Sequence, residues 1–189
     1  ILHRDISLHN IIITRPATAD GFKGMLIDLD MACTRESDQD GASHAVGTLP
    51  YMAVEVLLEI DHTYRHDVES FFYVLLRMCG REAWDPVKGL AVEGEKQRKV
   101  SCFQEWHTGT LEGIAGTKKG QMANLDLLGE LVMCEFPKAL DVVKPLCEEL
   151  WEIIFPRKGR GLNYGTPWSN PDDLYDPIIT AFDKAISLL

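Results

Sequence analysis

The sequence lacks a long hydrophobic run. Its longest uninterrupted apolar segment is Phe71–Leu76, whereas a helix that crosses a bilayer needs about 20 apolar residues. Nothing among the first residues resembles a secretion signal. We therefore expect a protein that has no membrane partner and resides in the cytoplasm or the nucleus.

Basic residues are also scarce. The chain holds 19 Lys and Arg against 29 Asp and Glu, which gives a formal net charge of -10. A general nucleic-acid binder needs a basic face that neutralises phosphates, so we expect no nucleic-acid partner. The two short basic clusters, at 96–99 and 157–160, are expected to be solvated surface.

Cysteine pairs that would bind zinc or form a redox centre are missing. The five cysteines are odd in number, and no two of them are spaced as CxxC. We expect reduced and mostly buried thiols, which are typical of intracellular proteins.

The composition that remains is that of a folded domain. Of the 189 residues, 46% are hydrophobic and 25% are charged, which is ordinary for a globular protein. The length fits one domain or a large part of one. Because the chain begins at Ile1 rather than Met, and a functional motif begins at His3 with almost no chain before it, we expect a fragment of a longer protein.

The hydrophobic pattern predicts a mainly α fold with one small β-hairpin. Asn10–Thr14 and Met25–Asp28 are expected to be short buried strands, joined by the turn-rich segment 15–24. The polar segment 34–47 is expected to be a surface loop long enough to suggest a function.

Helical spacing covers most of the remaining chain. The segment 67–79 is apolar on nearly every face, so this helix is expected at the centre of the domain. The predicted helices are Ala53–Ile60, Asp67–Cys79, Glu95–Trp106, Met122–Phe136, Ala139–Phe155 and Asp172–Leu189.

The segment His3–Asn10, with the sequence HRDISLHN, fits the catalytic loop H-R-D-x-x-x-x-N of protein kinases. Phosphoryl transfer needs a carboxylate that orients the incoming hydroxyl and takes its proton, and an amide oxygen a few residues later that binds magnesium. Asp5 and Asn10 have this chemistry at this spacing.

Three later segments follow in the order expected of a kinase. Asp28 comes directly after the apolar residues MLI, in the place of the D-F-G aspartate that binds magnesium. Gly47–Glu55 resembles the G-T-x-x-Y-M-A-P-E segment that closes an activation loop. Asp67 stands where kinases place a buried Asp that accepts hydrogen bonds from backbone N–H groups of the catalytic loop.

Together, HRDIS..NI, LIDLDMA, GT..YMA.EVL and HDVESFFYVLL resemble the fungal-type protein kinase family, clearly over 2–79 and weakly beyond. The resemblance implies the C-terminal lobe of the protein-kinase-like fold, in which the small hairpin carries the catalytic and metal-binding loops. The implied parts are a catalytic loop 3–10, a metal-binding segment 28–30, an activation loop 31–55 and a helical subdomain 56–189.

The resemblance also implies roles for individual residues, with ATP and Mg²⁺ as cofactors and a protein as substrate. They are Asp5 as catalytic base, Asn10 and Asp28 as magnesium ligands, Arg4 as the sensor of a phosphorylated activation loop, Ile12 beneath the adenine, His3 and Leu29 in the hydrophobic spine between the lobes, Thr48 and Glu55 in the activation and substrate loop, and Asp67 as structural anchor.

Three residues depart from the kinase pattern. Ser7 stands where Ser/Thr kinases have a Lys that stabilises the transferring phosphate, and Val54 replaces the Pro of A-P-E. Asp30 replaces the Gly of D-F-G, which looks normal for the fungal-type family. Thr48 favours Ser/Thr over Tyr substrates. In the loop 34–47 we expect acidic residues, rather than a phosphate on Ser43, to pair with Arg4.

Two alternative functions remain open. The D-x-D pattern of Asp28 and Asp30 resembles the aminoglycoside and choline kinases, which phosphorylate small molecules. Ser7 and the missing N-terminal lobe are compatible with a pseudokinase or interaction module. Since the Gly-rich loop, the strand Lys and its Glu partner lie in that N-terminal lobe, we expect it as a partner of this chain and expect 1–189 alone to be inactive.

Overall fold

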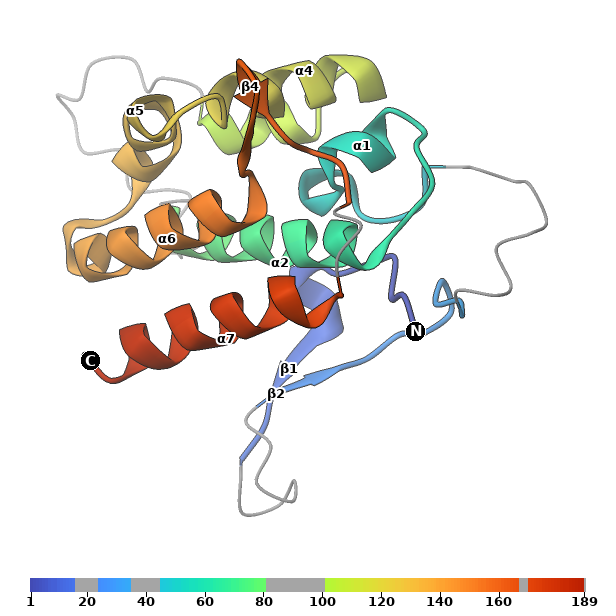
Figure 1. The fold of residues 1–189 in the computed structure, drawn as a ribbon, viewed down its shortest axis with the longest axis horizontal. Coiled ribbons are helices and arrows are strands. Elements are labelled where there is room, and N and C mark those ends of the chain that lie inside the picture. Colours follow the sequence, from blue (N-terminus) through green and yellow to red (C-terminus); the bar gives the residue numbers. More distant parts are fainter. Residues whose placement is uncertain (16–23, 35–44, 81–100, 167–169, 189) are drawn as a thin grey trace, which may run out of the picture.

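The computed structural model describes residues 1–15, 24–34, 45–80, 101–166 and 170–188. Helices make up most of this part of the chain, so the mainly α prediction is confirmed (Figure 1). The described residues also form two antiparallel hairpins, where the sequence predicted one. They pair β1 (Ile11–Ile13) with β2 (Gly24–Leu26) and β3 (Arg157–Lys158) with β4 (Gly161–Leu162).

The first hairpin occurs where it was predicted, but its strands are not buried. Ile12 lies opposite Met25, and Ile13 lies opposite Gly24. The side chains of Ile12, Met25 and Ile13 are 43%, 51% and 83% exposed. The hairpin extends away from the helices, so they do not cover its apolar side chains (Figure 1).

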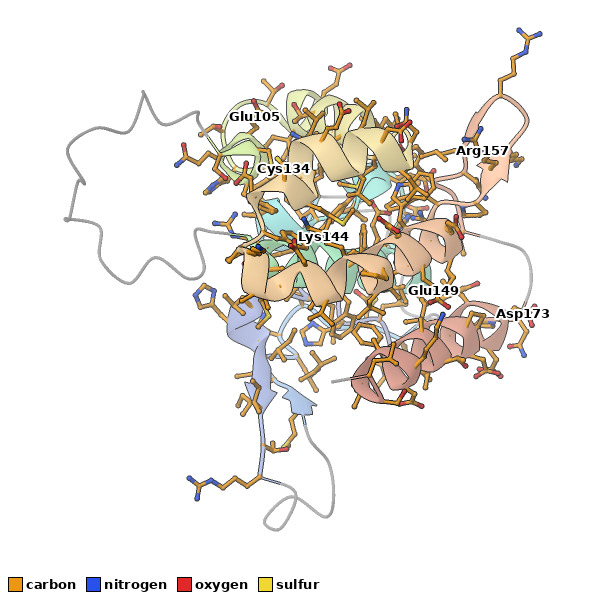
Figure 2. All side chains as sticks on the ribbon, turned by 90° about the vertical axis from the view of Figure 1, so that its left-hand side faces the viewer. Glu105, Cys134, Lys144, Glu149, Arg157 and Asp173 are labelled. Atoms are coloured by element: carbon orange, nitrogen blue, oxygen red, sulfur yellow. The ribbon has the colours of Figure 1, made fainter. Side chains whose placement is uncertain are left out.

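The second hairpin lies in one of the two predicted basic clusters. Gly159 connects its strands with φ at 64°, a left-handed conformation that glycine adopts without steric cost. Arg157 and Lys158 are exposed, as expected for solvated surface. Figure 2 shows Arg157 on this hairpin at the edge of the helical body. The other basic cluster, at 96–99, lies outside the described residues.

The central helix is α2 (Tyr64–Cys79), which buries Phe72, Tyr73 and Leu76 almost completely. It begins three residues before the predicted start at Asp67 because Thr63 caps it. The backbone N–H of Thr63 donates to Nδ1 of His66 at 3.1 Å, which is half of a capping box. Asp67 therefore lies inside the first turn and is not the N-cap.

The remaining helices surround α2, with α6 packed between α2 and α7, and α1 packed against α4 (Figure 1). The α-helices are α1 (Val54–Leu57), α4 (Leu111–Gln121), α5 (Leu125–Leu127), α6 (Lys144–Ile154) and α7 (Asp172–Ile186). The 3-10 turns are η1 (Leu8–Asn10), η4 (Leu49–Tyr51), η5 (Cys102–Trp106), η7 (Met133–Glu135) and η8 (Lys138–Val143), and η6 (Leu128–Val132) is a π-helical turn.

Capping residues explain several differences from the predicted helices. Asn124 accepts a hydrogen bond from the N–H of Leu127 at 2.8 Å, so α5 begins inside the predicted helix 122–136. Pro145 lies in the first turn of α6, where its missing N–H has no cost, so this helix begins later than predicted. The helix α4 was not predicted, because three glycines weaken its signal, although Thr110 caps it.

The predicted helix 95–106 is described only from Ser101 onward, where η5 replaces it. The hydrophobic core gathers on α2 and includes the edge-to-face pairs of Trp106 with Tyr73 and Phe103. A second cluster joins α1 to α4 through Val54, Leu57 and Ile114. None of the described helices is long and apolar enough to cross a membrane.

The five cysteines are free, and three of them are buried: Cys79, Cys102 and Cys147. Burial raises the pKa of the Cys79 thiol above its ordinary value. The same effect raises the pKa of Cys102 and Cys147, so these thiols stay protonated at neutral pH.

Candidate active site

The carboxylate of Asp5 is held from both sides by predicted site residues. Nδ2 of Asn10 donates to Oδ2 of Asp5 at 3.0 Å and to the Asp5 carbonyl oxygen at 2.9 Å. The backbone N–H and the hydroxyl of Thr48 both donate to Oδ1 of Asp5, at 2.8 and 2.7 Å. The structure thus brings together Asp5, Asn10 and Thr48, which the sequence separates by up to 43 positions.

The local sequence explains how Thr48 reaches Asp5. Gly47 has φ at 126°, and a Cβ at this position would come within 2.9 Å of the Arg4 carbonyl oxygen. Only glycine fits this backbone without displacement. On the other side, Ile6 and Ser7 are buried and η1 begins at Leu8, so the chain turns back and places Asn10 beside Asp5.

Asp67 contacts the beginning of the same loop. Its carboxylate accepts hydrogen bonds from the N–H groups of His3 at 2.7 Å and Arg4 at 3.0 Å, and it contacts Nε2 of His62 at 2.9 Å. Burial raises the pKa of Asp67, but the contacts with His62, His3 and Arg4 together lower it by more, so the pKa lies below its ordinary value. Asp67 is therefore ionised at neutral pH.

Arg4 adopts a left-handed backbone conformation, with φ at 69°. Such a conformation is costly for a residue with a side chain and persists only where its surroundings hold it. The hydrogen bond from the Arg4 N–H to Asp67 supplies such a contact. The loop that presents Asp5 is therefore fixed by α2 as well as by Asn10 and Thr48.

The segment that contains Asp28 is tied to this loop by backbone contacts. The N–H of Ile27 donates to the carbonyl oxygen of Asn10 at 3.0 Å, and Nε2 of His3 donates to the carbonyl oxygen of Ile27 at 3.1 Å. After the segment, Cys33 pairs with Leu2 in a β-bridge. Asp28 itself is exposed and has a left-handed φ of 64°.

The oxygen atoms of Asn10 and Asp28 fit a hard cation. Both hydrogen bonds of the Asn10 side chain come from its nitrogen, which leaves its amide oxygen for a ligand role. Mg²⁺ is bound by oxygen atoms and commonly by only one or two protein groups together with phosphates and water. Within the described ranges, no cluster of three His, Cys, Asp or Glu residues could hold a metal ion.

Of the residues predicted to contact the adenine or to stack in the spine, Ile12 and Leu29 are exposed, whereas His3 is buried. Ile12 is 43% exposed and Leu29 is 58% exposed. Neighbouring apolar side chains are exposed as well, namely Ile13, Met25, Leu26, Ile27 and Met31. The acidic residues predicted to pair with Arg4, and the candidate phosphorylation site Ser43, lie outside the described residues.

Glu55, the other residue predicted in the activation and substrate loop, contacts α2. Its Oε2 is 3.1 Å from Nε2 of His66. Since Nδ1 of His66 accepts the N–H of Thr63, the ring donates to Glu55 through Nε2 and is neutral. Burial is the main cause that lowers the pKa of His66, against the raising effect of Glu69 and Glu55.

Sequence reasoning missed a set of buried polar residues behind the site. Glu69 is fully buried and binds Arg65, Tyr73 and the N–H of Val54. Lys118 is fully buried on α4. Glu69 could have been noticed as a charged residue inside an apolar helix, whereas Lys118 had no such signal because α4 itself was not predicted.

Comparison with known proteins gives two findings. The sequence model of the fungal protein kinase family matches residues 1–79. A curated Arabidopsis thaliana protein, described as an L-type lectin-domain containing receptor kinase I.1, is 33% identical over 163 residues. That alignment covers 82% of this chain and 22% of the relative, so the chain spans about a fifth of the length of that protein.

No solved structure matches the chain. The family match and the contacts of Asp5 concern the same part of the molecule, since Asp5, Asn10, Asp28, Thr48 and Asp67 all lie between residues 1 and 79. Residues 1–79 of this chain are therefore similar to the fungal protein kinase family, and they hold all five of these residues.

Proposed function

We propose that the chain is the C-terminal lobe of a protein kinase that transfers the γ-phosphoryl group of ATP to Ser or Thr hydroxyls of a protein. The contacts of Asp5 with Asn10 and Thr48 support this most strongly. They hold a half-buried carboxylate in one orientation, as a group that receives a proton from a substrate hydroxyl requires.

In this proposal each site residue has a defined task. Asp5 orients the substrate hydroxyl and accepts its proton. The side-chain oxygens of Asn10 and Asp28 hold Mg²⁺, which supplies charge neutralisation for the phosphates when bound. Thr48 keeps the Asp5 carboxylate in place and belongs to the segment that contacts the protein substrate.

The parts of the lobe follow from the same assignment. Residues 3–10 form the catalytic loop, 28–30 the metal-binding segment, 31–55 the activation loop and 56–189 the helical subdomain. The exposed apolar side chains of Ile12 and Leu29 are where an N-terminal lobe packs and where the adenine binds. Without that lobe ATP is held from one side only, so 1–189 alone does not transfer phosphate.

The uncharged Ser7 gives no direct help to the phosphate in this scheme. It is buried, with 1% of its surface exposed, and carries no charge. Stabilisation of the transferring group therefore depends on Mg²⁺ and on groups of the N-terminal lobe.

The test is phosphate transfer from ATP to a protein by this chain preceded by the N-terminal lobe of a fungal-type protein kinase. Asp5→Asn keeps the shape of the side chain and removes its basicity, so transfer falls about 10²-fold or more. The matched control is Asp61→Asn, the same substitution at an exposed position after α1, which leaves transfer unchanged. Equal activity of Asp5→Asn and the parent would overturn the proposal and favour an interaction module.

A further inference from the structure

Lys118, in the third turn of α4, is fully buried at 0% exposure. Lysine is almost never fully buried unless it has partners, because removing its charge from water is costly. The neighbouring Lys119 is exposed, so burial is not a general property of this part of α4. The buried position therefore requires a local explanation.

The amine of Lys118 binds two carbonyl oxygens of one turn. Its Nζ donates to the carbonyl oxygen of Pro50 at 2.9 Å and to that of Met52 at 2.7 Å. These two residues lie on either side of Tyr51, at the end of η4. A side chain that reaches across 66 and 68 positions of sequence thus fixes two peptide groups of η4.

Aromatic rings enclose the same amine. Nζ lies 3.9 Å from the centre of the Tyr73 ring and 5.1 Å from that of Trp106. Hydrogen bonds hold both rings in place, from the Tyr73 hydroxyl to Glu69 at 2.7 Å and from Nε1 of Trp106 to Gln121 at 2.6 Å. The amine therefore has a prepared position, with cation–π contacts as well as hydrogen bonds.

The Lys118 amine can bind the turn whether it is protonated or neutral. Burial lowers the pKa of Lys118 to about 7, against the raising effect of the Glu69 carboxylate and with a smaller lowering effect of Arg77. An ammonium group has three N–H bonds and a neutral amine has two, so either form donates to both carbonyls.

The turn η4 leads directly to the candidate active site. Thr48 immediately precedes Leu49, and its carbonyl oxygen accepts the N–H of Tyr51 at 2.9 Å. The same Thr48 donates its N–H and its hydroxyl to Asp5. Contacts therefore run without interruption from Lys118 through η4 and Thr48 to the Asp5 carboxylate.

We propose that Lys118 is a positioning residue, which holds the turn η4 so that Thr48 stays bound to Asp5. The structural part of this inference stands on the contacts alone, and its consequence for phosphate transfer rests on the proposed function. Lys118 touches no reacting group; it acts through Thr48.

Amide hydrogen exchange of the chain 1–189 tests the inference without any assay of activity. Lys118→Met keeps much of the length and apolar volume of the side chain and removes its donors. The amides of Thr48, Tyr51 and Met52 then exchange about tenfold faster or more, because the turn opens more often. Amides of α6 exchange at the parent rate.

Lys119→Met is the matched control, since it removes one lysine from the neighbouring position of the same helix. Lys119 lies over the Tyr164 ring at 5.5 Å and does not reach η4, so exchange at Thr48, Tyr51 and Met52 is unchanged. Unchanged exchange of these three amides in Lys118→Met overturns the inference. A general acceleration that includes α6 also overturns it, because Lys118 is then only a part of the core.

A second measurement uses the unsubstituted chain and covers the case that Lys118→Met does not fold. In NMR spectra of the chain with labelled lysine, one Nζ signal is protected from exchange with water. Absence of any protected lysine amine overturns the inference.

Phosphate transfer separates this inference from the proposed function. With the N-terminal lobe present, Lys118→Met lowers kcat/KM for the protein substrate about tenfold and leaves KM for ATP near the parent value. If no version transfers phosphate, the proposed function fails while the exchange result still decides the role of Lys118. If transfer is normal in Lys118→Met although the turn opens, the positioning role is wrong.

Discussion

The backbone N–H of Val54 donates a hydrogen bond of 2.8 Å to Oε1 of Glu69, inside the protein. In the kinase segment that Gly47–Glu55 resembles, this position is a proline, which has no N–H. Here the N–H takes part in a buried network in which Glu69 also binds Arg65 and Tyr73. The departure from the kinase pattern at Val54 thus has a structural partner on α2.

This relationship predicts that proline is unfavourable at position 54. Val54→Pro removes one of the hydrogen bonds that satisfy the buried Glu69 carboxylate, so the free energy of unfolding falls by about 1–3 kcal/mol. The measurement is equilibrium unfolding in urea. Val54→Ala keeps the N–H and serves as the reference for the lost side chain, and a proline variant as stable as the alanine variant would contradict this account.

Asp67 predicts a pH-dependent stability. Its pKa is lowered in the folded chain from an ordinary value of 3.8, so the unfolded chain binds the proton more tightly. The contribution of the Asp67 charge to the free energy of unfolding is complete above pH 5, and it is lost as the pH falls through 3.8 towards the lower pKa of the folded chain.

Asp67→Asn therefore destabilises the chain at pH 7, and the difference from the parent shrinks at acid pH. We expect the pH 7 difference to be about 1–3 kcal/mol, since the N–H groups of His3 and Arg4 lose a charged acceptor. Urea unfolding of both chains between pH 3 and 7 measures it. A difference that stays constant over this range would show that the charge of Asp67 is unimportant.

Several features of the site could be predicted from the sequence because they depend on short spacings. Asp5 and Asn10 lie within one turn-like loop, so their side chains meet wherever that loop forms. The mainly α fold followed from the apolar spacing of the helices. The start of α2 was predicted too late because the cap formed by Thr63 and His66 is polar and adds nothing to a hydrophobic pattern.

Other features depend on contacts between distant segments and had no local signal. Lys118 is separated by 66 positions from Met52, and the three glycines of α4 concealed the helix that carries it. The strands β1 and β2 are apolar and were expected to be buried, but the described helices do not cover them. Burial of a strand depends on what packs against it, which its own sequence does not specify.

The lowered pKa of Lys118 also predicts how the free energy of unfolding changes with pH above neutrality. Its pKa is about 7 in the folded chain and 10.5 as the ordinary value, so between these values the unfolded chain binds the additional proton. The contribution of Lys118 to the free energy of unfolding therefore rises with pH, by up to about 1.4 kcal/mol per pH unit. Lys118→Met removes this rise.

The comparison is made between pH 7 and 8.5 by urea unfolding. Buried thiols such as Cys79 act in the opposite direction near pH 9, but they are present in both chains and cancel in the difference. Lys119→Met, at the exposed position, keeps the slope of the parent. Parallel pH curves for the parent and Lys118→Met would mean that the pKa of Lys118 is not lowered.

The proposed metal-binding role predicts different effects of the same substitution at two exposed aspartates that are two positions apart. Asp28→Asn and Asp30→Asn make the same chemical change at neighbouring exposed sites. Asp28 directly follows Ile27, whose backbone is bound to Asn10 and His3, whereas Asp30 lies two positions further along the chain.

The most direct test of the central claim is Mg²⁺-dependent phosphate transfer to protein by this pair of variants, with the N-terminal lobe present. The account predicts that Asp28→Asn lowers kcat about 10²-fold or more, with partial recovery at high Mg²⁺ concentration, and that Asp30→Asn stays within a few-fold of the parent. Equal losses in both variants, together with transfer to a small-molecule hydroxyl but not to protein, would contradict the account and favour a small-molecule kinase.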